Sequence, residues 1–211
     1  MSTIAQHIAA IRATLPQGVQ LICVSKFHPA EAILEAYNAG ERDFGESRVQ
    51  ELCAKQPQLP ADIRWHFIGH LQTNKVRQIV PFVHLIHSVD SVRLLETINS
   101  EAAKIDRIVN ILLEVHTANE TTKSGFLPEE LQALDLDQYE HLNICGLMTM
   151  ATNTDDEAEI HRCFRLLNSL ADSDPRFAIR SMGMSDDYLL AIQDGANMIR
   201  IGTDIFGARQ Y

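Results

Sequence analysis

The sequence lacks the features of a membrane protein, a metalloprotein and a nucleic-acid-binding protein. No apolar run approaches the roughly 18 residues that a membrane-spanning helix needs. The four cysteines, Cys23, Cys53, Cys145 and Cys163, have no metal-ligand spacing, so we expect no metal site. Basic residues are few: 18 Lys and Arg stand against 28 Asp and Glu, and the formal net charge is −10. That balance argues against a nucleic acid or an anionic membrane as partner, since both attract basic patches.

The cysteines and the first residues predict a cytoplasmic protein. Cys23 and Cys145 lie inside apolar, strand-like runs, where a cysteine is usually a small buried hydrophobic residue. We therefore expect all four cysteines to be reduced thiols. Apolar residues recur at helical spacing over residues 4–15, with charged residues between them. This pattern predicts an amphipathic helix and not a signal peptide.

Strand-like and helix-like segments alternate along the whole chain. The predicted strands are 19–26, 43–46, 64–69, 85–89, 109–115, 143–150, 178–182 and 198–201. The predicted helices between them are 30–39, 47–55, 74–80, 91–104, a short one from 128, 155–171 and 186–192. Strict alternation implies a parallel sheet, so we expect an α/β protein with one (β/α)8 TIM barrel domain over residues 1–211. The extra N-terminal helix is expected to cover the bottom of the barrel. A doubly wound open sheet is the alternative, although no Gly-rich dinucleotide turn follows the first strand.

Lys26 ends the first predicted strand, just before Phe27-His28-Pro29. In such barrels the functional residues lie at the C-terminal ends of the strands. Partial desolvation there lowers the pKa of a lysine and makes its amine a nucleophile toward aldehydes. The alternative is a lysine whose stem is buried while its ammonium group reaches solvent.

Two glycine-containing turns predict a phosphate site. Ser181-Met182-Gly183-Met184-Ser185 ends the seventh strand and Gly202-Thr203 ends the eighth, and a helical segment follows each. Helix N-termini offer unpaired N–H groups, and these barrels commonly bind phosphate after strands seven and eight. The simpler alternative is that Ser185 and Thr203 are ordinary helix N-caps.

Arg200 lies within the last predicted strand. A charged side chain inside a barrel is costly unless it is paired or functional. Its guanidinium group could donate to a ring nitrogen or to a substrate anion. Alternatively, it forms a structural ion pair with a carboxylate such as Glu46.

The lysine, the phosphate turns and the arginine together suggest pyridoxal 5′-phosphate (PLP). At these positions the chain resembles the PLP-binding homeostasis proteins, relatives of the alanine racemase N-terminal barrel domain. The matching stretches are 24–26, 44–51, 65–75, 146–150, 181–187 and 200–207. The most specific are Trp65-His66-Phe67-Ile68-Gly69 and Ser181-Met182-Gly183-Met184-Ser185.

The resemblance implies a role for each matching residue. Lys26 would form a Schiff base with PLP, and Arg200 would lie near the pyridine nitrogen, where an arginine makes the cofactor a weaker electron sink. The residues placed at the phosphate are Ser185, Gly202 and Thr203, with the backbone N–H of Met184. The further candidate contacts are Ser47, His66, Lys123 and Met148.

Some of these positions have a simpler reading or depart from the family. Ser47 stands where family members usually have Asn, and His70, where they commonly have Pro, is expected to face solvent. His66 could instead be a buried, hydrogen-bonded histidine, and Lys123 a solvated loop lysine. The methionines expected to pack the barrel lumen are Met148, Met150, Met182 and Met184, of which Met148 and Met184 are the candidates for ring contacts.

The resemblance implies a PLP carrier or reservoir in intracellular homeostasis, with indirect effects on amino-acid pools and with PLP-dependent apo-enzymes as partners. We expect no dedicated catalytic residue, because related racemases take a second base from another domain and a partner subunit, and the chain ends at Tyr211. A monomer is expected for the same reason. A PLP-dependent racemase-like enzyme is the alternative, followed by a Schiff-base aldolase, which would be colourless.

Overall fold

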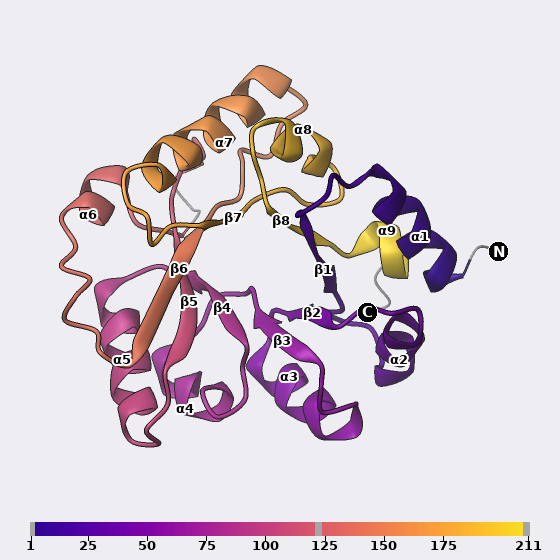
Figure 1. Ribbon diagram of the computed structural model, residues 1–211, viewed down its shortest axis with the longest axis horizontal. Helices are drawn as coiled ribbons and strands as arrows, with labels where there is room; N and C mark the ends of the chain where they lie inside the picture. Colours follow the sequence, from indigo (N-terminus) through magenta and orange to yellow (C-terminus); the bar gives the residue numbers. More distant parts are fainter. Residues whose placement is uncertain (1–2, 121–123, 209–211) are drawn as a thin grey trace.

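Eight parallel strands close into a barrel in the computed structural model, which describes residues 3–120 and 124–208 (Figure 1). Each strand pairs with the next along the chain, and β8 closes the barrel on β1. The strands are β1 Gln20–Val24, β2 Asp43–Glu46, β3 Arg64–Phe67, β4 Leu85–Val89, β5 Val109–Glu114, β6 Leu142–Met148, β7 Ile179–Ser181 and β8 Met198–Ile201. The predicted (β/α)8 barrel is confirmed, and the open-sheet alternative is wrong.

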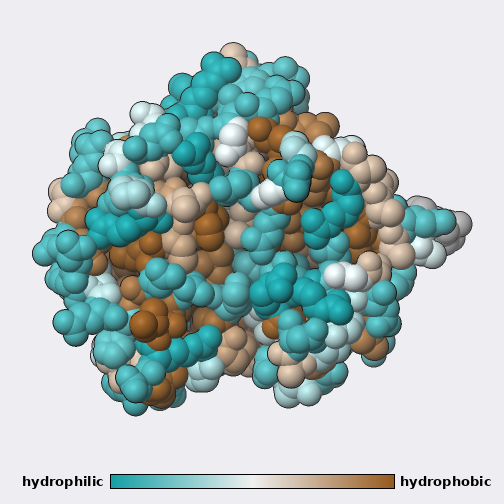
Figure 2. Space-filling view, in the orientation of Figure 1, coloured by the Kyte–Doolittle hydropathy of each residue, from teal (hydrophilic) through white to brown (hydrophobic). Residues whose placement is uncertain are grey.

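Helices surround the barrel (Figure 1). They are α1 Ile4–Thr14, α2 Ala30–Asn38, α3 Val49–Lys55, α4 Val76–Ile79, α5 Val92–Ala103, α6 Pro128–Gln132, α7 Glu157–Ala171, α8 Tyr188–Gln193 and α9 Thr203–Phe206, with 3-10 turns at Gln56–Gln58 and Thr73–Lys75. None of those in the described part of the chain is long and apolar enough to cross a membrane. Figure 2 shows hydrophilic residues over most of the face that it presents, with apolar surface in patches between them.

The N-terminal helix takes a different place from the one expected. Helix α1 packs against α2 and α9 in the outer ring and does not close the bottom of the barrel (Figure 1). Helix α9 is only 4 residues long and cannot cover its side of the barrel alone. Ile8 and Ile11 of α1 are buried there, and His7 Nδ1 lies 2.9 Å from the carbonyl oxygen of Ile205.

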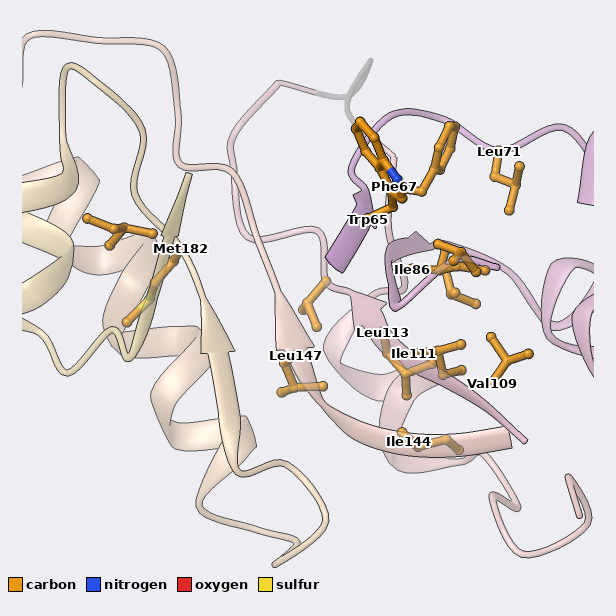
Figure 3. Packing of buried hydrophobic residues seen from close by; sticks show 14 of the residues in the cluster. Trp65, Phe67, Leu71, Ile86, Val109, Ile111, Leu113, Ile144, Leu147 and Met182 are labelled. Carbon is orange, nitrogen blue, oxygen red and sulfur yellow. The ribbon is translucent and has the colours of Figure 1, made fainter. Parts of the chain in front are cut away.

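The apolar core has two layers that follow the alternation of side chains along each strand. The outer layer lies between strands and helices, and Figure 3 shows part of it. The lumen holds a smaller buried cluster of Ile22, Leu85, Leu112, Met148 and Met198, with Met150 packed against it. Met182 belongs to the outer layer, so its predicted place in the lumen is wrong. It follows Ser181, which faces the lumen, and alternation turns Met182 outward.

Candidate functional site

A cavity of about 210 Å³ at the C-terminal ends of the strands brings most of the predicted residues together. Its lining is Val24, Lys26, His28, Ser47, Ile68, Met150, Met184, Ser185, Asp186, Arg200, Gly202, Thr203 and Gly207. Seven of the ten predicted cofactor-binding residues are in this set: Lys26, Ser47, Met184, Ser185, Arg200, Gly202 and Thr203. Residues from both ends of the chain therefore meet at one place, as closure of β8 on β1 requires.

Two of the other predicted residues, Met148 and His66, do not line this cavity. Met148 is buried in the lumen cluster. His66 is fully buried and hydrogen-bonded to Asp43 and His87, as its alternative interpretation had it. Lys123 lies outside the described residues. His70 is exposed, as expected, and its Nδ1 lies 3.1 Å from a carboxylate oxygen of Asp90.

The turn that carries Lys26 has an unusual backbone. Strand β1 ends at Val24, two residues earlier than the sequence pattern predicts, and Phe27 has a φ of 67°. Few residues other than glycine adopt a positive φ, and such strain is concentrated at functional sites. The N–H of Phe27 donates to Glu51 Oε1 at 2.6 Å, and the guanidinium carbon of Arg48 lies 4.5 Å from the centre of the Phe27 ring. These contacts hold the turn in place from α3.

A buried ion cluster supports the same turn, and sequence reasoning missed it. The ammonium group of Lys55 donates to the carbonyl oxygen of Ser25 at 3.0 Å, to Glu46 at 2.7 Å and to Glu51 at 2.6 Å. Glu46 is fully buried, and its other donor is the hydroxyl of Ser25 at 2.7 Å. Burial raises the pKa of Glu46 to about 7, against the opposing effect of Lys55. The only sequence signal was the i,i+4 spacing of Glu51 and Lys55.

The phosphate turns do not have the N-caps that the simpler interpretation required. Helix α8 is capped by Asp187 and α9 by Gly202, so neither Ser185 nor Thr203 is an N-cap. Within the described part of the chain, neither hydroxyl has a hydrogen-bond partner. Both are therefore available to a ligand in the cavity.

The backbone N–H of Met184 is not available in the same way. It donates to Asp187 Oδ1 at 2.6 Å, and its use for phosphate stays a prediction. The turn before it needs Gly183, which has a φ of 94° and where a Cβ would lie 2.7 Å from that of Ala191. Met184 is 39% exposed and lines the cavity.

Arg200 is held from below the cavity by two hydrogen bonds. Its Nη1 donates to Ser181 Oγ at 2.7 Å and its Nη2 to the carbonyl oxygen of Thr149 at 2.9 Å. The alternative ion pair with Glu46 is wrong, because Glu46 pairs with Lys55. Burial lowers the pKa of Arg200 to about 10, so the guanidinium group is still charged at neutral pH.

Glu114, at the end of β5, is a second buried acid that sequence reasoning missed. It is 4% exposed, and burial raises its pKa to about 7; Asp90 adds to the rise, while Arg200 and His70 oppose it. In the unfolded chain a glutamate has a pKa near 4.5. Between these values the folded protein keeps a proton that the unfolded chain has lost, so rising pH destabilises the fold.

We predict that Glu114→Gln removes this pH dependence. From pH 5 to pH 8 the wild-type protein should lose up to about 3 kcal/mol of unfolding free energy relative to the variant. Urea unfolding across this range measures the difference. The exposed Glu129→Gln variant controls for loss of a charge, and a constant difference between wild type and Glu114→Gln would contradict the prediction.

No three His, Cys, Asp or Glu side chains gather as a metal site would require within residues 3–120 and 124–208.

Comparisons with known proteins identify the family to which this fold belongs. The family model described as alanine racemase, N-terminal domain, matches residues 1–210. A pyridoxal phosphate homeostasis protein from Pseudomonas aeruginosa is 41% identical over 226 residues, covering 100% of this chain and 98% of that one. The solved structure of PipY from Synechococcus elongatus without PLP superposes with a TM-score of 0.92 at 42% identity, covering 97% of this chain and 100% of PipY.

A second PipY structure, with PLP bound, has a TM-score of 0.88 at 41% identity, with the same coverage. Alanine racemase from Clostridium difficile shares the fold, with a TM-score of 0.83 at 14% identity, but this chain covers only 57% of it. The chain therefore belongs to the alanine racemase N-terminal domain family, and within it to the group of pyridoxal phosphate homeostasis proteins.

Proposed function

We propose that this chain binds PLP covalently through the amine of Lys26 and acts in PLP homeostasis as a carrier and reservoir. The PLP-bound structure of the related PipY and the curated relatives named for PLP homeostasis support the proposal. When bound, the cofactor supplies an aldehyde that condenses with a lysine amine. The observation that carries the proposal is that Lys26, Arg200 and the hydroxyl-bearing residues Ser185 and Thr203 line one cavity.

Each of these groups suits one part of the cofactor. The hydroxyls of Ser185 and Thr203 can donate to a phosphate, and Gly202 lets the ligand approach the backbone without a side chain between them. A guanidinium group only donates, so Arg200 suits an unprotonated ring nitrogen and disfavours carbanion chemistry on the cofactor. Ser47 and Met184 line the walls and would flank the ring.

Removing either hydroxyl should weaken PLP binding without preventing its attachment to Lys26. We expect Ser185→Ala and Thr203→Val each to raise the dissociation constant about tenfold, because each loses a hydrogen bond to a charged phosphate. Titration of the visible absorbance measures the constant. Ser100→Ala, on the exposed side of α5, is the matched control. Unchanged binding in both cavity variants would place the phosphate elsewhere.

The carrier role is tested by mixing the loaded protein with the apo-form of a PLP-dependent enzyme. We expect the visible band of the loaded protein to fall as the enzyme gains activity. A phosphatase that destroys free PLP separates direct transfer from release into solution. A colourless protein that takes up no PLP would instead favour the Schiff-base aldolase.

A racemase-like enzyme is the second candidate, and one observation favours it. His28 lines the cavity two residues after Lys26, and its ring stacks on Phe206 at 5.1 Å between centroids, so an imidazole is present near the proposed cofactor. An enzyme would exchange the α-proton of an amino acid in deuterated water, and both Lys26→Ala and His28→Ala would abolish the exchange. The carrier role predicts no such turnover.

We also infer that the chain works as a single-domain monomer in the cytoplasm. The carrier role needs no second acid or base from another subunit, which supports a monomer. All four cysteines are unpaired thiols, which supports a reducing compartment. Sedimentation equilibrium of the loaded protein measures its molecular mass, and the mass of a dimer would contradict the proposed monomer.

A further inference from the structure

A chain of buried polar side chains crosses the barrel lumen beneath the cavity. Arg200 Nη1 lies 2.7 Å from Ser181 Oγ, which lies 3.0 Å from His87 Nδ1. His87 Nε2 lies 2.9 Å from His66 Nδ1, and His66 Nε2 lies 3.0 Å from Asp43 Oδ1. Each of the five residues is at most 4% exposed. Apolar residues fill most of the lumen, so such a polar chain has to be hydrogen-bonded throughout.

These hydrogen-bonded side chains connect the two ends of the barrel. Arg200 lies in the cavity, whereas Asp43 is the first residue of β2, at the opposite end of the strands. Arg64, the first residue of β3, donates its Nε to Asp43 Oδ1 at 2.6 Å and its Nη2 to Oδ2 at 2.5 Å. The side chain of Arg64 is 45% exposed, so the far end of the chain reaches solvent.

Asp43 and Arg200 together determine the direction of every hydrogen bond between them. An ionised carboxylate only accepts, so His66 donates from Nε2, and the Nδ1 of the neutral ring must accept from His87 Nε2. His87 Nδ1 then accepts from the hydroxyl of Ser181, whose oxygen accepts from Arg200, a donor only. Ser181, His87 and His66 each accept one hydrogen bond from the Arg200 side and donate one toward Asp43.

The charge states are consistent with this direction. Burial lowers the pKa of His66 and lowers that of His87 further, so both rings are neutral at physiological pH. Burial alone would raise the pKa of Asp43, but hydrogen bonds from Arg64 and His66 outweigh it and hold the pKa well below its usual value.

We propose that Asp43, His66, His87 and Ser181 form a one-directional hydrogen-bond chain that positions Arg200 for the ring of the bound cofactor. The inference rests on the proposed PLP site. Ser181 and the carbonyl oxygen of Thr149 fix two nitrogens of the guanidinium group and therefore its plane. The histidines add no second positive charge next to Arg200. His66 thus acts on the cofactor through Arg200 and is a positioning residue, not a contact.

The tautomers of His66 and His87 test the proposed direction of the hydrogen bonds, and they can be determined in the protein without cofactor. Long-range ¹H–¹⁵N correlation NMR should show both imidazoles neutral at pH 7, with the proton on Nε2. A proton on Nδ1 of either ring, or a doubly protonated ring, would overturn the proposal. This measurement does not depend on PLP binding, so its failure is distinguishable from failure of the proposed function.

Ser181→Ala tests the effect on the cofactor by removing one oxygen atom. We expect PLP still to be fixed to Lys26 by borohydride, with affinity about tenfold lower and with a shifted visible band, because Arg200 loses one of its two anchors. Ser88→Ala is the matched control: Ser88 is equally buried, on β4, but its hydroxyl donates to the carbonyl oxygen of Gly69. If Ser181→Ala bound PLP with wild-type affinity and an unchanged visible band, the hydrogen-bond chain would not position Arg200.

Discussion

Replacing Lys26 with alanine should abolish the visible absorbance of the PLP-loaded protein. The variant loses the amine that joins the aldehyde, and the remaining contacts are non-covalent. We expect affinity for PLP to fall at least about a hundredfold, which corresponds to about 2.7 kcal/mol. Absorbance spectra after dialysis against PLP-free buffer measure retention, and titration measures affinity.

The fold of this variant should be intact. Lys26 lies in a turn after β1 and is only half-buried, so its side chain contributes little to the core. Circular dichroism and urea unfolding check this, and Lys104→Ala on the far surface is the control for loss of a lysine. Retention of a dialysis-resistant yellow colour by a folded Lys26→Ala protein would contradict the proposed site.

Replacing Lys55 with methionine should produce the largest loss of stability. It leaves Glu46 fully buried without its cation, and breaking a buried pair costs about 3 kcal/mol or more. The pKa of Glu46 is raised to about 7, so the carboxyl is protonated below this value and ionised above it. We therefore expect a smaller loss at pH 6 than at pH 8. Urea unfolding at both values measures the difference.

A double variant separates the buried charge from the loss of packing. Adding Glu46→Gln to Lys55→Met should restore part of the stability at pH 8, because no ionised carboxyl is then buried. Lys104→Met, whose partner Glu101 is at the surface, should change the unfolding free energy by less than about 0.5 kcal/mol. An equal loss at pH 6 and pH 8 would show that the ion pair is not what supports the turn.

The fold and the main site residues could be predicted because they depend on local patterns. Strand and helix periodicities alternate, so the barrel follows from the order of segments. Strand ends in a barrel share one rim, so Lys26, Ser185 and Thr203 could be placed together from sequence alone. The structure brings all three to the same cavity.

The interior could not be predicted, because it depends on register and on which face of a strand each residue takes. His66 and Met148 are part of stretches that match the family, yet they lie in the lumen below the cavity. Lys55 is at the end of a helix where a lysine is usually solvated, and only the packing of α3 on the turn after β1 makes it a buried partner of Glu46. The five residues of the hydrogen-bond chain from Asp43 to Arg200 come from five different strands, and no sequence signal connects them.

Borohydride reduction followed by peptide mass spectrometry tests most directly where the cofactor is attached. After PLP loading, reduction and proteolysis, we expect a single pyridoxyl-phosphate adduct on the peptide that contains Lys26. Unreduced protein and Lys26→Ala should yield no modified peptide. An adduct on Lys55, Lys75 or another lysine, with the Lys26 peptide unmodified, would contradict the proposed role of the amine at the end of β1.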